Sequence, residues 1–369
     1  MSLEPQLTFA TDSTLITAVG TLLAGLVAAA GTAALVPVVT RNILPKPRET
    51  HLADFLPFEA IDRDGRTVLM KDGSFTRYYL IGGLDQSFMD TEQALWTARK
   101  RMTFLDSLAE INVVSRIFTL RRKMPVVSAE SYPNQVAGDI AKKWNSQFKE
   151  AYRTINIIAL SGKSTPKLDE AEQAMTSNLA NFDVYNLTQD PATNNARMTL
   201  GEFLGSQVSP ASNPAPTSTG MNLSDALAGD IVWFSPDGII EFTSGQEKKY
   251  ALAIGMKRIG DDMSATMSSE LSSLPMEMTI SRYVEPMSKA EAIIKLEQHS
   301  RLATASSFNP VSTMQSFADA QAMVEGSDDT RSTLCAYSQT IFIYGKSIEE
   351  VLRHEVTVRQ VISSNGATA

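Results

Sequence analysis

Hydrophobic and polar positions beyond residue 65 follow two different periods along the chain. Short apolar runs, several of them alternating with polar residues, are separated by longer segments with apolar residues at helical spacing. The short runs predict β-strands and the longer segments predict amphipathic helices. We expect strands at residues 67–70, 75–81, 111–120, 154–160, 182–187, 231–234, 239–242, 250–258, 276–284 and 334–344. We expect helices at residues 91–108, 136–152, 167–180, 263–271, 288–303 and 347–362.

Turn and capping residues agree with several of these elements. Lys71-Asp72-Gly73-Ser74 separates the first two strands, and Ser235-Pro236-Asp237-Gly238 separates the strands at 231–234 and 239–242. Asp-Gly pairs tolerate the positive φ angles of tight turns, so both segments predict hairpins. Ser347 followed by Glu350 is the signature of a capping box at the start of the last helix.

The alternation of strands and helices predicts an α+β fold, in which mixed sheets pack against helices. Residues 67–187 and 231–362 both follow the order hairpin, strand, helix, strand, helix, strand, helix, with small differences. This order is consistent with two ferredoxin-like or split βαβ halves. No sequence repeat accompanies it, and simple recurrence of α/β alternation in a large domain is the alternative.

Proline and small polar residues divide the chain into expected parts. Residues 206–222 combine three prolines with many serines and threonines, which predicts a flexible loop with little to bury. We therefore expect a membrane segment and linker at residues 1–50, a first α/β subdomain at 51–205, the loop at 206–222 and a second α/β subdomain at 223–369.

The N-terminal run from Leu15 to Val39 carries no charged residue. As a helix rising ~1.5 Å per residue it would be roughly 37 Å long, against about 30 Å for a hydrocarbon core. Basic residues follow the run and none precedes it, which disfavours a secretory signal peptide and places the following residues in the cytoplasm. A buried or re-entrant hairpin divided at Gly31 is the alternative to a spanning helix.

Composition excludes several classes of function. The net charge is −8, which argues against nucleic acid as the main partner, because duplex binding needs clustered positive charge. The single cysteine, Cys335, cannot form an internal disulfide and fits a reducing compartment. His51, His299 and His354 are far apart in sequence and lack the spacing of a metal site.

One segment resembles part of a phosphate loop. Ser161-Gly162-Lys163-Ser164-Thr165 follows a predicted buried strand. A phosphate loop also needs a glycine five positions before the Gly-Lys pair, so that the backbone can wrap around the phosphates. That position is Ile157, inside the strand, so a surface turn is the better interpretation. Aspartates near turns and the abundant methionines are likewise best explained by turn geometry and core packing.

The order of several diffuse motifs resembles the VirB/TrbE/CagE family, the largest ATPases of type IV secretion. The segment LADFLPFEAIDRDGRTVLMKDGSFTRYYLIGGL at 52–84 is similar to the family's opening strands, and the likeness continues through 91–121. It returns at 250–301, which includes Leu274-Pro275-Met276-Glu277-Met278, and at 339–363. The resemblance covers most of residues 52–363, and each motif alone is weak.

The resemblance implies a docking and assembly role in conjugation or protein export. In this family the N-terminal half docks the ATPase to the inner-membrane complex and contacts neighbouring subunits. A C-terminal RecA-like half binds ATP and Mg²⁺. This chain lacks the motifs of that half, so we expect no catalytic, cofactor-binding or metal-binding residue and no cofactor on it.

The expected partners are other type IV secretion subunits of the inner-membrane complex and further copies of the chain. The expected location is the bacterial inner membrane, entered through Leu15 to Val39, with the bulk on the cytoplasmic face. Two alternatives stay open: a stand-alone membrane-anchored scaffold without an ATPase partner, and an unrelated enzyme with a scattered site.

Overall fold

The computed structural model describes residues 51–83, 89–124, 134–145, 150–190, 198–216, 221–259, 266–305, 318–322, 324 and 333–369. All of them belong to one compact unit, His51–Ala369. The expected membrane segment, Leu15 to Val39, lies outside the described residues. Within the described ranges, no helix is both long and apolar enough to cross a membrane.

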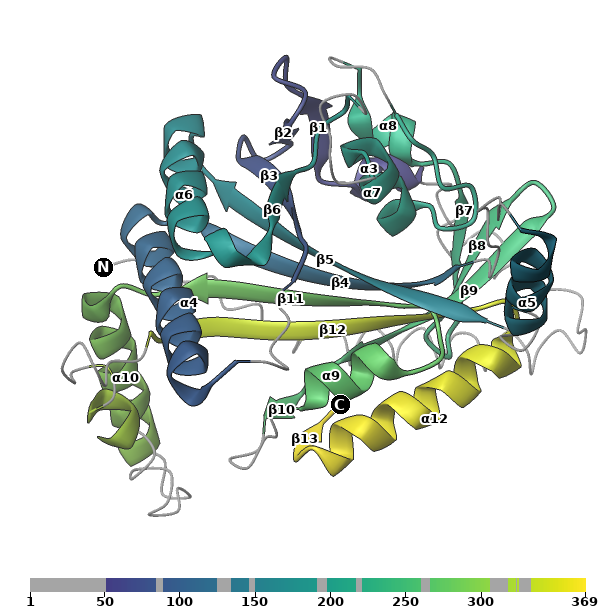
Figure 1. Ribbon diagram of the computed structural model, residues 1–369. Helices are drawn as coiled ribbons and strands as arrows, with labels where there is room; N and C mark the ends of the chain where they lie inside the picture. The colour runs from purple at the N-terminus through teal and green to yellow at the C-terminus, as the bar shows by residue number, and fades with distance from the viewer. Residues whose placement is uncertain are drawn as a thin grey trace, which may run out of the picture. The chain divides into compact units, whose positions relative to one another are not determined.

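A large sheet runs through the unit and is antiparallel at every strand pairing described (Figure 1). Its strand order is β1-β2-β3-β5-β4-β11-β12-β9-β8-β7, and β6 pairs with β3 beside this path. The strands are β1 (Phe58–Ile61), β2 (Thr67–Met70), β3 (Phe75–Ile81), β4 (Val114–Met124), β5 (Ala151–Gly162), β6 (Val184–Asn186), β7 (Ile231–Phe234), β8 (Ile239–Ser244), β9 (Glu247–Gly255), β11 (Met278–Pro286) and β12 (Cys335–Gly345). A separate pair joins β10 (Arg258–Ile259) to β13 (Ala367–Thr368).

Helices connect and cover these strands. They are α3 (Leu52–Phe55), α4 (Thr91–Ile111), α5 (Gln135–Asn145), α6 (Thr165–Asn178), α7 (Leu200–Val208), α8 (Leu223–Leu227), α9 (Met267–Ser273), α10 (Lys289–Ala305) and α12 (Ile348–Ser364), with a 3₁₀ turn at Ala180–Phe182. The predicted α+β class is therefore confirmed.

The two halves of the sheet share one topology. In the first half β5 lies between β3 and β4, and helix α4 connects β3 to β4. In the second half β12 lies between β9 and β11, and α9 lies between β9 and β11 in the sequence. Each half is a split βαβ unit followed by a helix, α6 or α12. The halves meet where β4 pairs antiparallel with β11, so the predicted duplication is visible in the strand order.

Local sequence explains the turns and helix starts. Gly73 and Gly238 adopt φ angles of 78° and 79° in the two predicted hairpin turns, a region that glycine enters without steric cost. The Asp90 side chain accepts a hydrogen bond from the Gln93 N–H at the start of α4. Ser347 accepts one from the Glu350 N–H at the start of α12. Both predicted helix starts are confirmed.

Alternate residues of the strands face two different layers. Tyr79 of β3 packs with Phe104 of α4 and Leu168 of α6, on one face of the sheet. Tyr78, the preceding residue, packs with Phe203 of α7 on the other face. In the second half a further core joins β9, β11 and β12 to α9 and α12, which share the face of α4 and α6 because the strand register continues across β4 and β11.

Strand β4 differs from its predicted bounds. The basic residues at 121–123 were expected to end a strand at 111–120, but they lie inside β4. The Arg122 guanidinium donates to the carbonyl oxygen of Met278 at 2.9 Å and to the Thr279 hydroxyl at 2.9 Å. Arg121 donates to the Ser273 carbonyl at 3.2 Å. These cations connect the two halves, a role that strand periodicity does not reveal.

Residues 206–222 were expected to form a flexible loop, but residues 206–208 are the end of α7. This helix begins with a capping box between Thr199 and Glu202. The chain then folds back on the helix: a Cβ on Gly205 would lie 1.7 Å from the Pro214 carbonyl oxygen. The Asp230 carboxylate accepts hydrogen bonds from the backbone N–H groups at 211 and 212, at 2.8 Å each. Glycines in α7 therefore give the prolines a surface to pack against.

Candidate functional site

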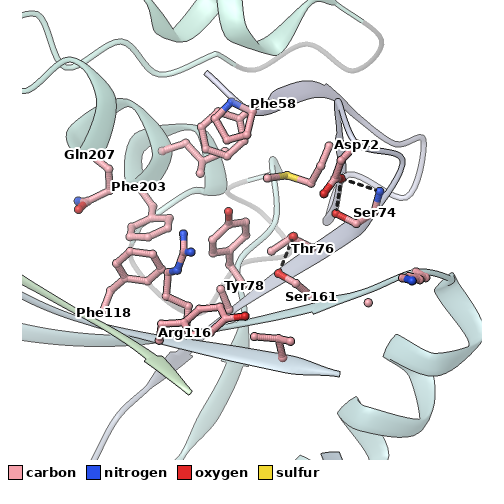
Figure 2. A pocket seen from close by; sticks show the side chains of 18 of the residues that line it. Phe58, Asp72, Ser74, Thr76, Tyr78, Arg116, Phe118, Ser161, Phe203 and Gln207 are labelled. Carbon is pink, nitrogen blue, oxygen red and sulfur yellow. Dashed lines mark hydrogen bonds between the residues drawn. The ribbon is translucent and has the colours of Figure 1, made fainter. Parts of the chain in front are cut away.

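A groove with a volume of about 540 Å³ lies on the sheet face that carries α7 (Figure 2). Strands β3, β4 and β5 form its base, Tyr283 of β11 lies on its border, and α7 and the β1–β2 hairpin form its sides. It brings together aromatic and charged side chains from strands and a helix that are far apart in the sequence. We treat it as the candidate site.

Aromatic side chains form one wall of the groove. The Phe203 ring lies 5.3 Å from the Tyr78 ring and 5.4 Å from the Phe118 ring, measured between centroids. The Phe203–Phe118 contact is edge-to-face, a favourable arrangement for aromatic pairs. Figure 2 shows Phe58 on the side of the groove away from Phe118. The wall is thus built by strands and a helix far apart in sequence.

Short polar side chains form the opposite wall. The Thr76 and Ser161 hydroxyls are 2.9 Å apart on adjacent strands. The Asp72 carboxylate accepts the Ser74 hydroxyl at 2.6 Å and the Ser74 N–H at 2.9 Å. These hydrogen bonds hold the pKa of Asp72 below its usual value, with the Ser74 hydroxyl as the first cause. Asp72 therefore stays ionised and already has partners within its turn.

Two cations line the groove. Arg116 projects from β4, and its guanidinium lies 5.7 Å from the centre of the Tyr283 ring. Lys163 follows β5 directly. Both side chains are exposed, and neither forms an ion pair with any carboxylate among the residues that the structure describes. The lining of the groove thus carries two positive charges, from Arg116 and Lys163, and one negative charge, from Asp72.

Tyr78 carries a polar group into the groove. Its side chain is 6% exposed and lines the groove next to Arg116. Burial raises the pKa of Tyr78, and the nearby Arg116 charge acts in the opposite direction. The hydroxyl thus remains protonated and can donate a hydrogen bond to a molecule in the groove.

The segment that resembled a phosphate loop lies at one end of the groove. Strand β5 ends at Gly162 and α6 begins at Thr165, so the connection is a short strand-to-helix turn. Ile157, where a phosphate loop needs glycine, is fully buried within β5. Ser164 precedes α6 without a side-chain capping bond. This geometry has no loop that could wrap phosphates, and Lys163 instead borders the groove.

The histidines and the cysteine do not come together as a site. Among the described residues, no group of three or more His, Cys, Asp or Glu side chains is placed to hold a metal ion. His354 lies with Nδ1 3.3 Å from the Tyr344 carbonyl oxygen. Cys335 is half-buried, and burial, followed by the Asp106 charge, raises the pKa of its thiol. Its thiol is therefore mostly protonated at neutral pH.

A second surface feature is the edge strand β7. Ile231, Trp233 and Phe234 are 76%, 70% and 69% exposed, and β8 is the only neighbour of β7 in the described strand order. An edge strand presents unpaired backbone groups, and exposed large apolar side chains mark sites of protein contact. The sequence predicted this hairpin but gave no sign that its outer side chains are uncovered.

A comparison with known protein families gives a match for part of the chain. The family model described as "CagE, TrbE, VirB family, component of type IV transporter system" matches residues 188–369. The matched segment contains α7, which forms a side of the groove, and the edge strand β7. No curated protein sequence matches the chain.

Proposed function

The chain belongs to the CagE, TrbE, VirB family of type IV transporter components, and from this premise we propose that it acts as a docking and assembly domain of such a transporter. In this role residues 51–369 bind other subunits and connect them to one another. The family match over residues 188–369 is the observation that carries the proposal.

Exposed apolar surface on the matched segment supports a docking role. Trp233 and Phe234 leave about two-thirds or more of their surface in water, on a strand whose outer edge is free in the described structure. Burial of apolar surface contributes roughly 25 cal/mol per Å², so a partner strand on this edge would gain free energy from both backbone pairing and side-chain burial. We place a contact with another transporter subunit here.

Phosphate chemistry is not part of the proposed role. The turn at Lys163 joins β5 to α6 through two residues, and Ile157 occupies the position that a phosphate loop gives to glycine. We therefore propose that residues 51–369 hold no ATP or Mg²⁺ themselves. The proposal also includes a location at the bacterial inner membrane, with this unit on the cytoplasmic side, and contacts to further copies of the chain.

Co-purification tests the docking role. The tagged full-length chain would be isolated, after mild crosslinking, from cells that encode the transporter, and bound proteins would be identified by mass spectrometry. We expect other type IV transporter components with the unmodified chain, and far less of them with the double substitution Trp233→Ser and Phe234→Ser.

Val356→Ser is the matched control, because Val356 is 67% exposed on α12, away from β7. It should leave the recovered components unchanged. Recovery of no transporter component by the unmodified chain would contradict the docking role. Equal recovery with the β7 variant would contradict the placement of the contact on β7.

A further inference from the structure

The groove beneath α7 carries positive charge in a chain that is otherwise acidic. The whole chain has a net charge of −8. Three charged side chains line the groove: Arg116, Lys163 and Asp72. Asp72 is held by hydrogen bonds from Ser74, whereas Arg116 and Lys163 form no ion pair within the described residues. The groove therefore favours an anionic ligand that most of this protein would repel.

The Tyr78 hydroxyl indicates which anionic group the ligand carries. It belongs to β3 and faces the groove, beside the Arg116 guanidinium. A phenol hydroxyl that opens into the groove can donate a hydrogen bond to an acceptor on a ligand. A guanidinium and a phenol hydroxyl together offer N–H and O–H donors, and this set suits a carboxylate. Figure 2 shows Arg116 and Tyr78 side by side in the groove.

The aromatic walls of the groove indicate that the ligand also has an apolar part. Phe118 and Phe203 form a packed aromatic surface, and Phe58 lies across from it. A volume of about 540 Å³ is larger than a single aromatic side chain needs, and it falls within the range of about 300–1,000 Å³ that is typical of ligand sites. The occupant thus combines a carboxylate with large apolar groups.

We propose that this groove binds a segment of a partner protein in which an Asp or Glu side chain lies next to aromatic or large aliphatic residues. Arg116 and Tyr78 hold the carboxylate, Lys163 adds positive charge at the border, and Phe118 and Phe203 contact the apolar side chains. The identity of the partner as a transporter subunit rests on the proposed function, whereas the chemistry of the segment rests on the groove alone.

Selection from a peptide library tests this inference. Phage displaying random 12-residue peptides would be selected on the full-length chain, and enriched peptides would be labelled with fluorescein for anisotropy titrations. We expect enriched peptides to carry Asp or Glu within two positions of Phe, Trp, Leu or Met. The double substitution Arg116→Glu and Lys163→Glu should weaken their binding by about tenfold or more, since charge-assisted hydrogen bonds are lost and repulsion is added.

Two further variants separate binding from folding. Tyr78→Phe keeps the ring and removes the hydroxyl, so we expect a two- to tenfold loss of affinity, as for a neutral hydrogen bond, ~0.5–1.5 kcal/mol. Arg153→Glu reverses an exposed charge on the same strand as Ser161, outside the groove, and should change the affinity by less than about twofold. Thermal unfolding followed by circular dichroism confirms that each variant is folded.

The inference fails if the enriched peptides lack the acidic and apolar pattern, or if they bind the Arg116→Glu and Lys163→Glu variant as well as the unmodified chain. It also fails if the full-length chain alone, with p-benzoylphenylalanine in place of Gln207, crosslinks from the groove to its own residues 1–50 or to a second copy. Because the selection uses no other transporter component, these outcomes leave the docking role itself untouched.

Discussion

At the scale of single residues, the buried cation Arg77 shows how strand and helix are joined. Its side chain is 3% exposed, and its guanidinium donates to Asp169 at 2.6 Å and to Glu172 at 3.1 Å, both on α6. Its Nε donates to the Thr67 hydroxyl at 2.9 Å. Glu172 also accepts from Tyr79 of β3, at 3.2 Å. A buried charge is tolerated here because two carboxylates accept from the guanidinium and its Nε also has a partner.

Substitution of Arg77 by methionine should destabilise the protein. The variant keeps the aliphatic volume but leaves carboxylates of α6 without their buried partner, which typically costs ~3–5 kcal/mol when fully buried. Because Asp169 is 57% exposed, we expect about 3 kcal/mol. Urea unfolding of the full-length chain measures this loss. The exposed control Arg153→Met should stay within about 0.5 kcal/mol, and a loss below about 1 kcal/mol for Arg77→Met would contradict the assigned role.

Glu277 predicts a dependence of stability on pH. Burial raises its pKa, but the Lys249 ammonium at 2.9 Å and the Lys123 N–H lower it more, so the pKa lies below its ordinary value of 4.5. Below that value the unfolded chain binds more protons than the folded one. The stabilisation from Glu277 is therefore present above pH 4.5 and is lost as the pH falls through the folded-state pKa.

Glu277→Gln should reduce the free energy of unfolding at neutral pH and flatten its decline in acid. Urea unfolding at a series of pH values below and above 4.5 measures both effects. Glu170→Gln, on the exposed surface of α6, is the control and should keep the slope of the unmodified chain. An unchanged slope in Glu277→Gln would show that other carboxylates cause the acid sensitivity.

The residues that line the groove could not be identified as a site from the sequence. Tyr78, Arg116 and Phe118 were visible only as members of predicted strands. Their common property is that they occupy the same face of β3 and β4, which flank β5, and that face depends on the register between the three strands. Phe203 comes from a helix that the sequence pattern did not predict. No local sequence motif therefore predicts the groove.

At the scale of elements, the helices and hairpins predicted most accurately from the sequence are those whose structure depends on residues within a few positions. Both Asp-Gly hairpins, helix α4 and helix α12 follow from turn, cap and periodicity rules that act within a few residues. The misplaced elements depend on distant partners instead. Strand β5 begins at Ala151 rather than 154, because its first residues pair with the end of β4. The predicted helix at 136–152 gives α5, which ends at Asn145, before that pairing begins.

The packing of α7 on the proline-rich segment predicts opposite effects for two helical glycines. In an open helix, Gly→Ala stabilises by about 0.4–1 kcal/mol. A Cβ on Gly205 would lie 1.7 Å from the Pro214 carbonyl oxygen, so the backbone must move. We expect Gly205→Ala to cost about 1–3 kcal/mol, as other overpacked substitutions do.

Gly138 on α5 provides the matched comparison, because an added Cβ there meets nothing within 4 Å. Gly138→Ala should be neutral or stabilising. Thermal unfolding of both variants measures these two changes in stability. Equal stability of Gly205→Ala and the unmodified chain would mean that residues 213–216 do not pack on α7 in solution.

At the scale of the whole unit, the two split βαβ halves share one sheet. Seven residue pairs join β4 to β11, from Met278↔Arg121 to Val284↔Ser115. Arg282 of β11 donates to the Thr119 hydroxyl at 3.0 Å across the same junction. The junction is built like the interior of a single sheet, and it lies between the expected subdomains at 51–205 and 223–369. Their division into separate domains stays a prediction.

A continuous junction predicts that both halves unfold together. Calorimetry of the full-length chain should give one cooperative transition for residues 51–369, because separation of the halves would expose the pairing edges of β4 and β11. Proteolysis and circular dichroism should report the same midpoint. Two resolved transitions would show that the halves are independent domains that merely align their strands.

In the role that we propose, this unit serves a type IV transporter through contact surfaces. Photocrosslinking in living cells tests it most directly. The full-length chain would carry p-benzoylphenylalanine in place of Trp233, on the exposed edge strand, or in place of Val356 as the control. We expect position 233 to form a covalent adduct with another component of the transporter and position 356 to form none. Adducts at position 233 only with proteins unrelated to the transporter, or no adduct at all, would contradict the account.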